Sequence, residues 1–218
     1  MIIATILDES RSMECIKKAT IDGFNEFVSE RRNDLESTNK SLKKFIKIMF
    51  NTSAIKTEYD NIDDVELLNE DNYCPSGMTA LNDAIGIGLD SIKDNKEDEI
   101  WFIIITDGME NRSTIYDRDE IKKAISKYKK YDNWNFIFCG ANQDSYLSSK
   151  QIGMDKDDTI INFAPNAVSV GALYRGISRQ VSGSGFEEPP QTYFSEPEPI
   201  RSAARPKLFR TVTNQINI

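Results

Sequence analysis

The chain has 218 residues, with 27 Lys and Arg against 35 Asp and Glu, which gives a net charge of −8 and an isoelectric point near 4.8. Its 39% of hydrophobic residues suffices for a folded core, and its length fits one domain with or without an appendage. The acidic balance argues against a general nucleic-acid-binding protein, and the absence of histidine excludes Ser-His-Asp triads, Cys-His pairs and histidine metal sites.

The sequence predicts a cytoplasmic protein without a membrane partner. Its three cysteines, Cys15, Cys74 and Cys139, are far apart and lack CxxC spacing, which is typical of reduced thiols. The longest uninterrupted apolar run, Ile100–Ile105, is far shorter than the roughly 20 residues that cross a bilayer. Met1–Leu7 has neither a basic leader nor a cleavage site, so we do not expect secretion.

The first part of the chain predicts a strand, a helix and a hairpin. Met1–Leu7 is an apolar, β-branched run that stops at an aspartate, which indicates a core strand. Hydrophobic residues recur at helical spacing within Ile16–Phe27, and a polar connector follows at 33–41. The two strand-like runs Phe45–Phe50 and Ala54–Tyr59 flank an Asn-Thr-Ser turn, so we expect an antiparallel hairpin.

Helices and strands then alternate after an acidic stretch up to Tyr73, which we expect to be a solvated loop. Leu81–Ile92 carries apolar residues at i, i+3, i+4 and i+7, the pattern of a helix packed on a core. Ile100–Thr106 and Trp134–Gly140 are apolar runs typical of strands buried on both faces of a parallel sheet. Between them, an aspartate and a glutamate three residues apart predict a capping box at Asp117.

A short strand at Thr159–Phe163 and a helix beginning at Pro165 complete the alternation. Strands that alternate with helices predict an α/β fold: a Rossmann-like, doubly wound and mostly parallel sheet with one antiparallel edge strand and helices on both faces. We assign residues 1–182 to this domain. Residues 183–218, rich in proline and glutamate, are expected to form an extended or docking arm with four acidic and four basic residues.

Three segments carry small oxygen-bearing side chains where the predicted strands end or a helix begins. They are Asp8 to Ser12, Ser76 to Thr79, and the triplet Thr106-Asp107-Gly108. Open parallel sheets gather their ligands at the carboxyl ends of the strands. The candidate metal ligands are two carboxylates and three hydroxyls: Asp8, Ser10, Ser12, Thr79 and Asp107. This all-oxygen set suits Mg²⁺, Mn²⁺ or Ca²⁺ and not zinc, and it leaves room for one more oxygen from a partner's carboxylate.

The Asp8-x-Ser10-x-Ser12 motif, Thr79 ahead of a helix and the Thr106-Asp107-Gly108 triplet resemble the metal-ion-dependent adhesion site of von Willebrand factor type A (vWA) domains. The resemblance covers Met1 to about Val181. Within the family, the segments at 107–113 and 140–144 are most similar to intracellular bacterial and phage proteins.

This resemblance implies a Rossmann-like sheet, a divalent cation (Mg²⁺ first) at the five residues above, and a metal-mediated contact with an acidic side chain of another protein. It implies no catalytic activity. Family members of this kind often work beside AAA ATPases or stress-response proteins, so such proteins are the expected partners. Departures from the family pattern, Glu9, Arg11 and Met78 at positions where small residues are common, bear on the affinity for the ion.

Three other interpretations remain open from the sequence. The serines and Thr79 would also serve as helix caps or turn residues. Asp8 would be the nucleophile of a Mg²⁺-dependent phosphohydrolase resembling the haloacid dehalogenase class, although Ser10 stands where such enzymes have a second aspartate. Alternatively, the C-terminal arm, with aromatic residues among its prolines, would mediate self-assembly in a structural protein of a phage or bacterial complex.

Overall fold

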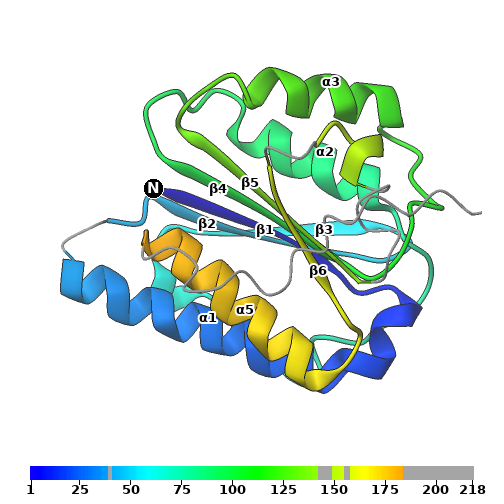
Figure 1. The fold of residues 1–218 in the computed structure, drawn as a ribbon, viewed down its shortest axis with the longest axis horizontal. Helices are drawn as coiled ribbons and strands as arrows, with labels where there is room; N and C mark the ends of the chain where they lie inside the picture. The colour runs from blue at the N-terminus through cyan, green and yellow to red at the C-terminus, as the bar shows by residue number, and fades with distance from the viewer. Residues whose placement is uncertain (39–40, 142–148, 155–157, 184–218) are drawn as a thin grey trace, which may run out of the picture.

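The structure, a computed structural model, describes residues 1–38, 41–141, 149–154 and 158–183. A six-stranded sheet runs through the middle of this part of the chain (Figure 1). Its strands are Ile2–Asp8 (β1), Lys44–Phe50 (β2), Ala54–Tyr59 (β3), Ile100–Thr106 (β4), Trp134–Ala141 (β5) and Thr159–Phe163 (β6). They lie in the order β3-β2-β1-β4-β5-β6.

The direction of strand succession reverses at the centre of the sheet. β1 pairs in parallel with β2 on one side and with β4 on the other, and β5 and β6 continue the parallel arrangement. β3 is antiparallel to β2 at the edge, with Ala54 opposite Phe50. The predicted fold class is therefore confirmed. β2, which follows β1 in the chain, lies on one side of it, and β4 lies on the other. A crevice is therefore expected between the carboxyl ends of β1 and β4, where sheets of this kind bind ligands.

Helices cover both faces of the sheet. α1 (Lys17–Thr38) and α5 (Ala167–Ser182) lie on one face, and α2 (Leu81–Ile92) and α3 (Arg118–Tyr128) lie on the other (Figure 1). Two short 3-10 helices, Arg11–Ile16 (η1) and Ile62–Asp64 (η2), follow β1 and β3.

Residue alternation along β1 explains how one strand serves both layers. Ile3 and Leu7 contact the α1 and α5 side, whereas Ile2, Ala4 and Ile6 contact the α2 and α3 side. Every residue of β1 is buried, which is why the strand is mostly apolar rather than alternating, with Thr5 and Asp8 as its two polar residues.

Two helix boundaries differ from the prediction. α1 runs to Thr38, through most of the connector predicted at 33–41, because Leu35 still packs against the core. The last helix starts after Pro165, since the side chain of Asn166 caps it by accepting a hydrogen bond from a backbone N–H of the first turn.

Two further segments were predicted by composition alone. The acidic stretch before Tyr73 is not a simple solvated loop, because three of its side chains, Ile62, Val65 and Leu68, are buried in the core beside α1, as is Tyr73 itself. The predicted C-terminal arm, apart from Gly183, lies outside the described residues.

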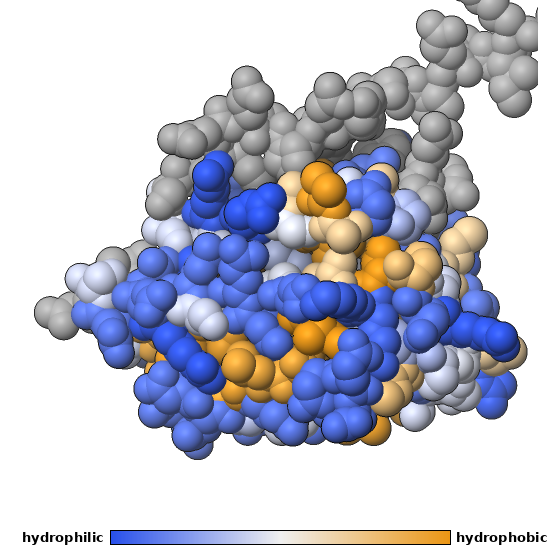
Figure 2. All heavy atoms as spheres, turned by 90° about the horizontal axis from the view of Figure 1, so that it is seen from below, coloured by the Kyte–Doolittle hydropathy of each residue, from blue (hydrophilic) through white to orange (hydrophobic). Residues whose placement is uncertain are grey.

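The outer surface beside α1 and α5 is mostly hydrophilic, with smaller hydrophobic areas between the polar residues (Figure 2). None of the helices in the described ranges is long and apolar enough to cross a membrane.

Close packing between α1 and α5 predicts opposite effects for two glycines. A Cβ at Gly23 would lie 2.2 Å from the buried Tyr174 ring, so Gly23→Ala is expected to lower the free energy of unfolding by about 1–3 kcal/mol. A Cβ at Gly171 meets only the flexible Arg175 side chain, at 3.3 Å, so Gly171→Ala is expected to raise stability by up to about 1 kcal/mol through helix propensity. Urea denaturation measures the free energy of unfolding of both variants. Equal changes in the two variants would contradict the predicted difference.

Candidate metal centre

All five predicted ligands lie at the carboxyl edge of the sheet. Asp8 is the last residue of β1, Ser10 is the N-cap of η1, and Ser12 lies in the first turn of η1. Asp107 comes directly after β4, and Thr79 lies two residues before α2. The structure therefore brings together the three segments that the sequence placed at strand and helix ends.

A chain of hydrogen bonds connects the loop after β1 to the loop after β4. Asp8 Oδ1 accepts a hydrogen bond from the Ser10 N–H at 2.7 Å. The hydroxyl oxygens of Ser10 and Ser12 are 3.2 Å apart, and Ser12 Oγ donates to Asp107 Oδ1 at 2.5 Å. Four of the five predicted ligands thus form one continuous polar cluster.

Thr79 joins this cluster from the third loop. Its Oγ1 lies 3.1 Å, and Ser12 Oγ 3.6 Å, from the position that a Cβ on Gly108 would occupy. A side chain at position 108 would fill the space between the two hydroxyls, which explains the glycine of the Thr-Asp-Gly triplet. Asn111 fixes the backbone of Thr79: its side-chain oxygen accepts from the Thr79 N–H at 2.9 Å, and its own N–H donates to the Thr79 carbonyl at 3.0 Å.

The helix-capping interpretation is wrong for two of these residues. Ser10 occupies the N-cap position of η1, but its side chain makes no capping hydrogen bond. The N-cap of α2 is Ala80, so Thr79 stands outside the helix. The hydroxyls of both residues instead face the polar cluster.

The environment of the cluster disfavours charge on its two carboxylates. Burial raises the pKa of Asp8 from 3.8 to about 6, against the lowering effect of hydrogen bonds from Thr106 and Ser10, and the nearby Asp107 adds to the rise. Burial also raises the pKa of Asp107. Within the described residues, no salt bridge joins either carboxylate to a lysine or arginine.

This donor set fits a hard divalent cation. It supplies only oxygen atoms, and a cation would offset the repulsion between Asp8 and Asp107. In the ranges that the structure describes, no three His, Cys, Asp or Glu side chains gather as a metal-binding group, so an ion here depends on the hydroxyls as well as on the carboxylates. The residues that would hold the ion are the predicted five, and their role as ligands stays a prediction.

Three residues that the sequence did not assign to the site support its first loop. Thr106 Oγ1 donates to Asp8 Oδ2 at 2.6 Å, and the buried Tyr73 hydroxyl donates to the Asp8 carbonyl at 2.7 Å. Glu9 Oε1 accepts from the Cys74 N–H at 2.6 Å, which ties the loop after β1 to the segment before Thr79. Thr106 had a sequence signal as part of the triplet, and Glu9 was noted in the sequence only as a departure from the family pattern.

The loop between β4 and α3 is bound to the start of α2 by side chains from both sides. Glu110 Oε2 accepts from the Asn82 N–H at 2.8 Å, and Ser113 Oγ accepts from the Asp83 N–H at 3.0 Å. Asp83 in return accepts hydrogen bonds, each of 2.9 Å, from three successive backbone N–H groups, those of Thr114, Ile115 and Tyr116. The loop that carries Asp107 and the helix that follows Thr79 are thereby fixed to each other.

The sequence matches no protein-family model and no curated protein. Solved structures are similar in fold. A von Willebrand factor type A protein from Catenulispora acidiphila has a TM-score of 0.56 at 13% identity, over 84% of this chain and 42% of that one. Proximal thread matrix protein 1 from the mussel byssus, with a zinc-occupied MIDAS motif, has a TM-score of 0.56 at 15% identity, over 83% and 47%. BatB from Bacteroides thetaiotaomicron has a TM-score of 0.51 at 13% identity, over 84% and 98%.

This chain spans less than half the length of the first two neighbours and nearly all of the third. At such low identities the likeness concerns the fold, and the narrower similarity to intracellular bacterial and phage proteins stays a prediction. The strand order, the helices on both faces and these neighbours agree with the resemblance found in the sequence. The chain has the fold of a von Willebrand factor type A domain.

Proposed function

We propose that this chain is an interaction module that holds a divalent cation at Asp8, Ser10, Ser12, Thr79 and Asp107 and binds an acidic side chain of a partner protein through it. The observation that carries the proposal is the single polar cluster that these five residues form at the carboxyl edge of the sheet. The zinc-occupied MIDAS motif of the mussel neighbour supports it.

Mg²⁺ is the ion that we propose first, because the donors are all oxygen atoms and Mg²⁺ is usually held by one or two carboxylates. When bound, the cation supplies a positive charge that accepts a further oxygen ligand. The residues of the chain hold the ion in place: Thr106 and the Ser10 N–H orient the Asp8 carboxylate, and Asn111 orients the backbone of Thr79.

Exposed apolar side chains beside the cluster favour a protein as the partner. Met78 and Met109, next to Thr79 and Gly108, are 50% and 54% exposed. Methionine is enriched at protein interfaces, where its flexible side chain adapts to the partner surface. A partner that places an acidic side chain at the ion would cover both methionines.

The role that we propose is binding and not catalysis. Ser10 stands where a phosphohydrolase of the resembling class has its second aspartate, and its hydroxyl contacts Ser12. By resemblance, the partner we propose is an AAA ATPase or a stress-response protein of the cytoplasm.

Calorimetric titration of Mg²⁺ and Mn²⁺ into the metal-free protein tests the site. We expect saturable binding by the wild type, at least a 100-fold loss of affinity in Asp107→Ala, and unchanged binding in Asp71→Ala, a control that removes an exposed carboxylate outside the cluster. Each tenfold loss of affinity corresponds to about 1.4 kcal/mol of binding free energy.

Two results would count against the site. One is the absence of saturable binding by the wild type in the presence and absence of a carboxylate such as acetate. The other is equal binding by Asp107→Ala and Asp71→Ala, which would place the ion elsewhere.

A further inference from the structure

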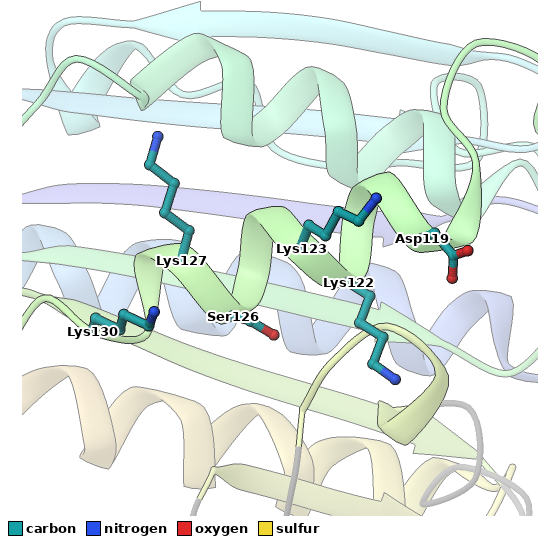
Figure 3. Close-up of a pocket in the computed structure, with 6 residues that line it drawn as sticks. All are labelled: Asp119, Lys122, Lys123, Ser126, Lys127 and Lys130. Atoms are coloured by element: carbon teal, nitrogen blue, oxygen red, sulfur yellow. The ribbon is translucent and has the colours of Figure 1, made fainter.

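Helix α3 exposes a row of four lysines on its outer side: Lys122, Lys123, Lys127 and Lys130, the last just beyond the helix end. They line a hollow of about 500 Å³, together with Ser126 and Asp119 (Figure 3). The turn at Gly153 borders the row, since a Cβ there would lie 2.9 Å from the Lys122 carbonyl and 3.2 Å from Ser126 Oγ. We call these four residues the lysine row.

The lysine row is not neutralised by the described part of the chain. None of its members makes an ion pair with a described residue, and Asp119 lies at the opposite end of the hollow from Lys130 (Figure 3). Lys123 and Lys127 are four residues apart on the helix, and like charges at this spacing destabilise a helix, while Lys130 adds a further positive charge just beyond the helix end. An anionic occupant would remove this repulsion.

An acidic segment of the same chain follows α5 directly. Between Gly183 and Ile200 the sequence has no lysine or arginine and four glutamates: Glu187, Glu188, Glu196 and Glu198. The whole chain has a charge of −8, so a free nucleic acid or an anionic membrane approaches it against a repulsive field. A segment that is covalently attached does not need to overcome that repulsion from solution, since it is present at an effective concentration in the millimolar range.

The fold places this segment within reach of the lysine row. α3 and α5 both run back from the carboxyl edge of the sheet, so the C-terminal ends of the two helices lie toward the same, amino edge of the sheet, on opposite faces (Figure 1). Lys130 comes two residues after the end of α3, and Gly183 directly after the end of α5. Two layers of secondary structure separate them, roughly 20 Å at about 10 Å per layer. An extended chain spans about 3.3 Å per residue, so Glu187 and Glu188 reach only roughly 13 to 17 Å from Gly183, whereas Glu196 and Glu198 reach roughly 43 to 50 Å and can span the separation.

We propose that the acidic segment 187–198 of this chain docks on the lysine row of α3 through glutamate–lysine ion pairs. Exposed pairs are individually weak and are screened by salt, so the docking depends on several pairs forming together and decreases with ionic strength. The surface is independent of the metal centre, and the inference does not depend on the proposed metal-dependent function.

Carbodiimide cross-linking of the full chain, which joins neighbouring carboxylates and amines as amides, tests the docking. In the monomer fraction, peptide mass spectrometry is expected to find cross-links from Glu196 and Glu198 to the lysine row, at least fivefold more often than to the exposed Lys18 on α1. The cross-links are expected to disappear at 1 M salt. A variant with all four glutamates changed to Gln should show at least twofold faster acetylation of the lysine row and unchanged acetylation of Lys18.

Each other outcome would overturn the proposal. Cross-links that form only between two copies would assign the row to self-assembly. Equal cross-linking of Lys18 and the lysine row would mean that the segment has no preferred position. Binding of a DNA duplex or of phosphatidylserine vesicles, lost when the row is changed to Gln and equal with and without the four glutamates, would assign the row to an external polyanion. Circular dichroism of each variant checks that the fold is retained.

Discussion

Replacing Asp83 by alanine is expected to lower the free energy of unfolding by about 2–4 kcal/mol. Asp83 is 5% exposed, and its carboxylate accepts hydrogen bonds from the N–H groups of Thr114, Ile115 and Tyr116 at 2.9 Å. Alanine would leave three donors without their acceptor, and the loop after β4 would be left with the hydrogen bonds that Glu110 and Ser113 accept from the start of α2. Chemical denaturation followed by circular dichroism measures the loss.

Two further variants test whether the loss of stability comes from the hydrogen bonds of the Asp83 carboxylate. Asp94→Ala removes an exposed carboxylate just beyond the end of α2 and is expected to change stability by less than about 0.5 kcal/mol. Asp83→Asn keeps one acceptor oxygen of the same shape and should fall between the wild type and Asp83→Ala. Equal stability of Asp83→Ala and Asp94→Ala would show that the loop is held by other contacts.

The parts of the fold that the sequence predicts are those with a hydrophobic pattern, which is either continuous or periodic. β4 is apolar at almost every position because it is buried on both faces, and α2 keeps its apolar residues at helical spacing because one face packs on the sheet. Two of the three segments that carry the site follow from the same reasoning, since parallel strands that end in polar residues must end at the same edge.

Other features have no periodic signature and were missed. Asp83 occupies a polar position of an amphipathic helix and looks solvated until the loop after β4 is placed over it. Tyr73 follows an acidic stretch, and only the tertiary structure shows that its hydroxyl supports the Asp8 carbonyl. The lysine row was missed because the net charge of the whole chain is negative, and a net charge does not show which charged residues lie together on a helix. Hydrogen bonds and charge clusters between distant segments depend on the packing of layers.

Asp8→Asn is expected to stabilise the metal-free protein at pH 7.5 while abolishing its response to Mg²⁺. In the folded protein burial raises the pKa of Asp8 to about 6 from its ordinary value of 3.8. Between these two values the native state binds more protons than the unfolded state, so the free energy of unfolding falls as the pH rises from about 4 to about 6 and changes no further above that range. Over this pH range Asp8 lowers the free energy of unfolding by about 3 kcal/mol, since one pKa unit corresponds to about 1.4 kcal/mol.

Asparagine retains the shape of the side chain without the charge. Its oxygen can accept the Ser10 N–H, and the Thr106 hydroxyl, 3.2 Å from the Gly108 carbonyl, has an alternative acceptor there. The variant should therefore lose the pH dependence attributed to Asp8. A bound cation reverses the balance in the wild type because it favours the ionised carboxylate, so the affinity for Mg²⁺ should rise with pH up to about 6 and then level off.

Thermal denaturation from pH 4 to 8, with Mg²⁺ or with a chelator, separates these effects. The wild type is expected to gain stability from Mg²⁺ above pH 6 and to lose it when the ion is removed, whereas Asp8→Asn should be more stable than the wild type in chelator and indifferent to Mg²⁺. Asp64→Asn, an exposed control, should match the wild type throughout. If the stability advantage of Asp8→Asn over the wild type in chelator does not grow between pH 4 and 6, burial does not disfavour the charged form of Asp8. A metal-responsive Asp8→Asn would remove this carboxylate from the ligand set.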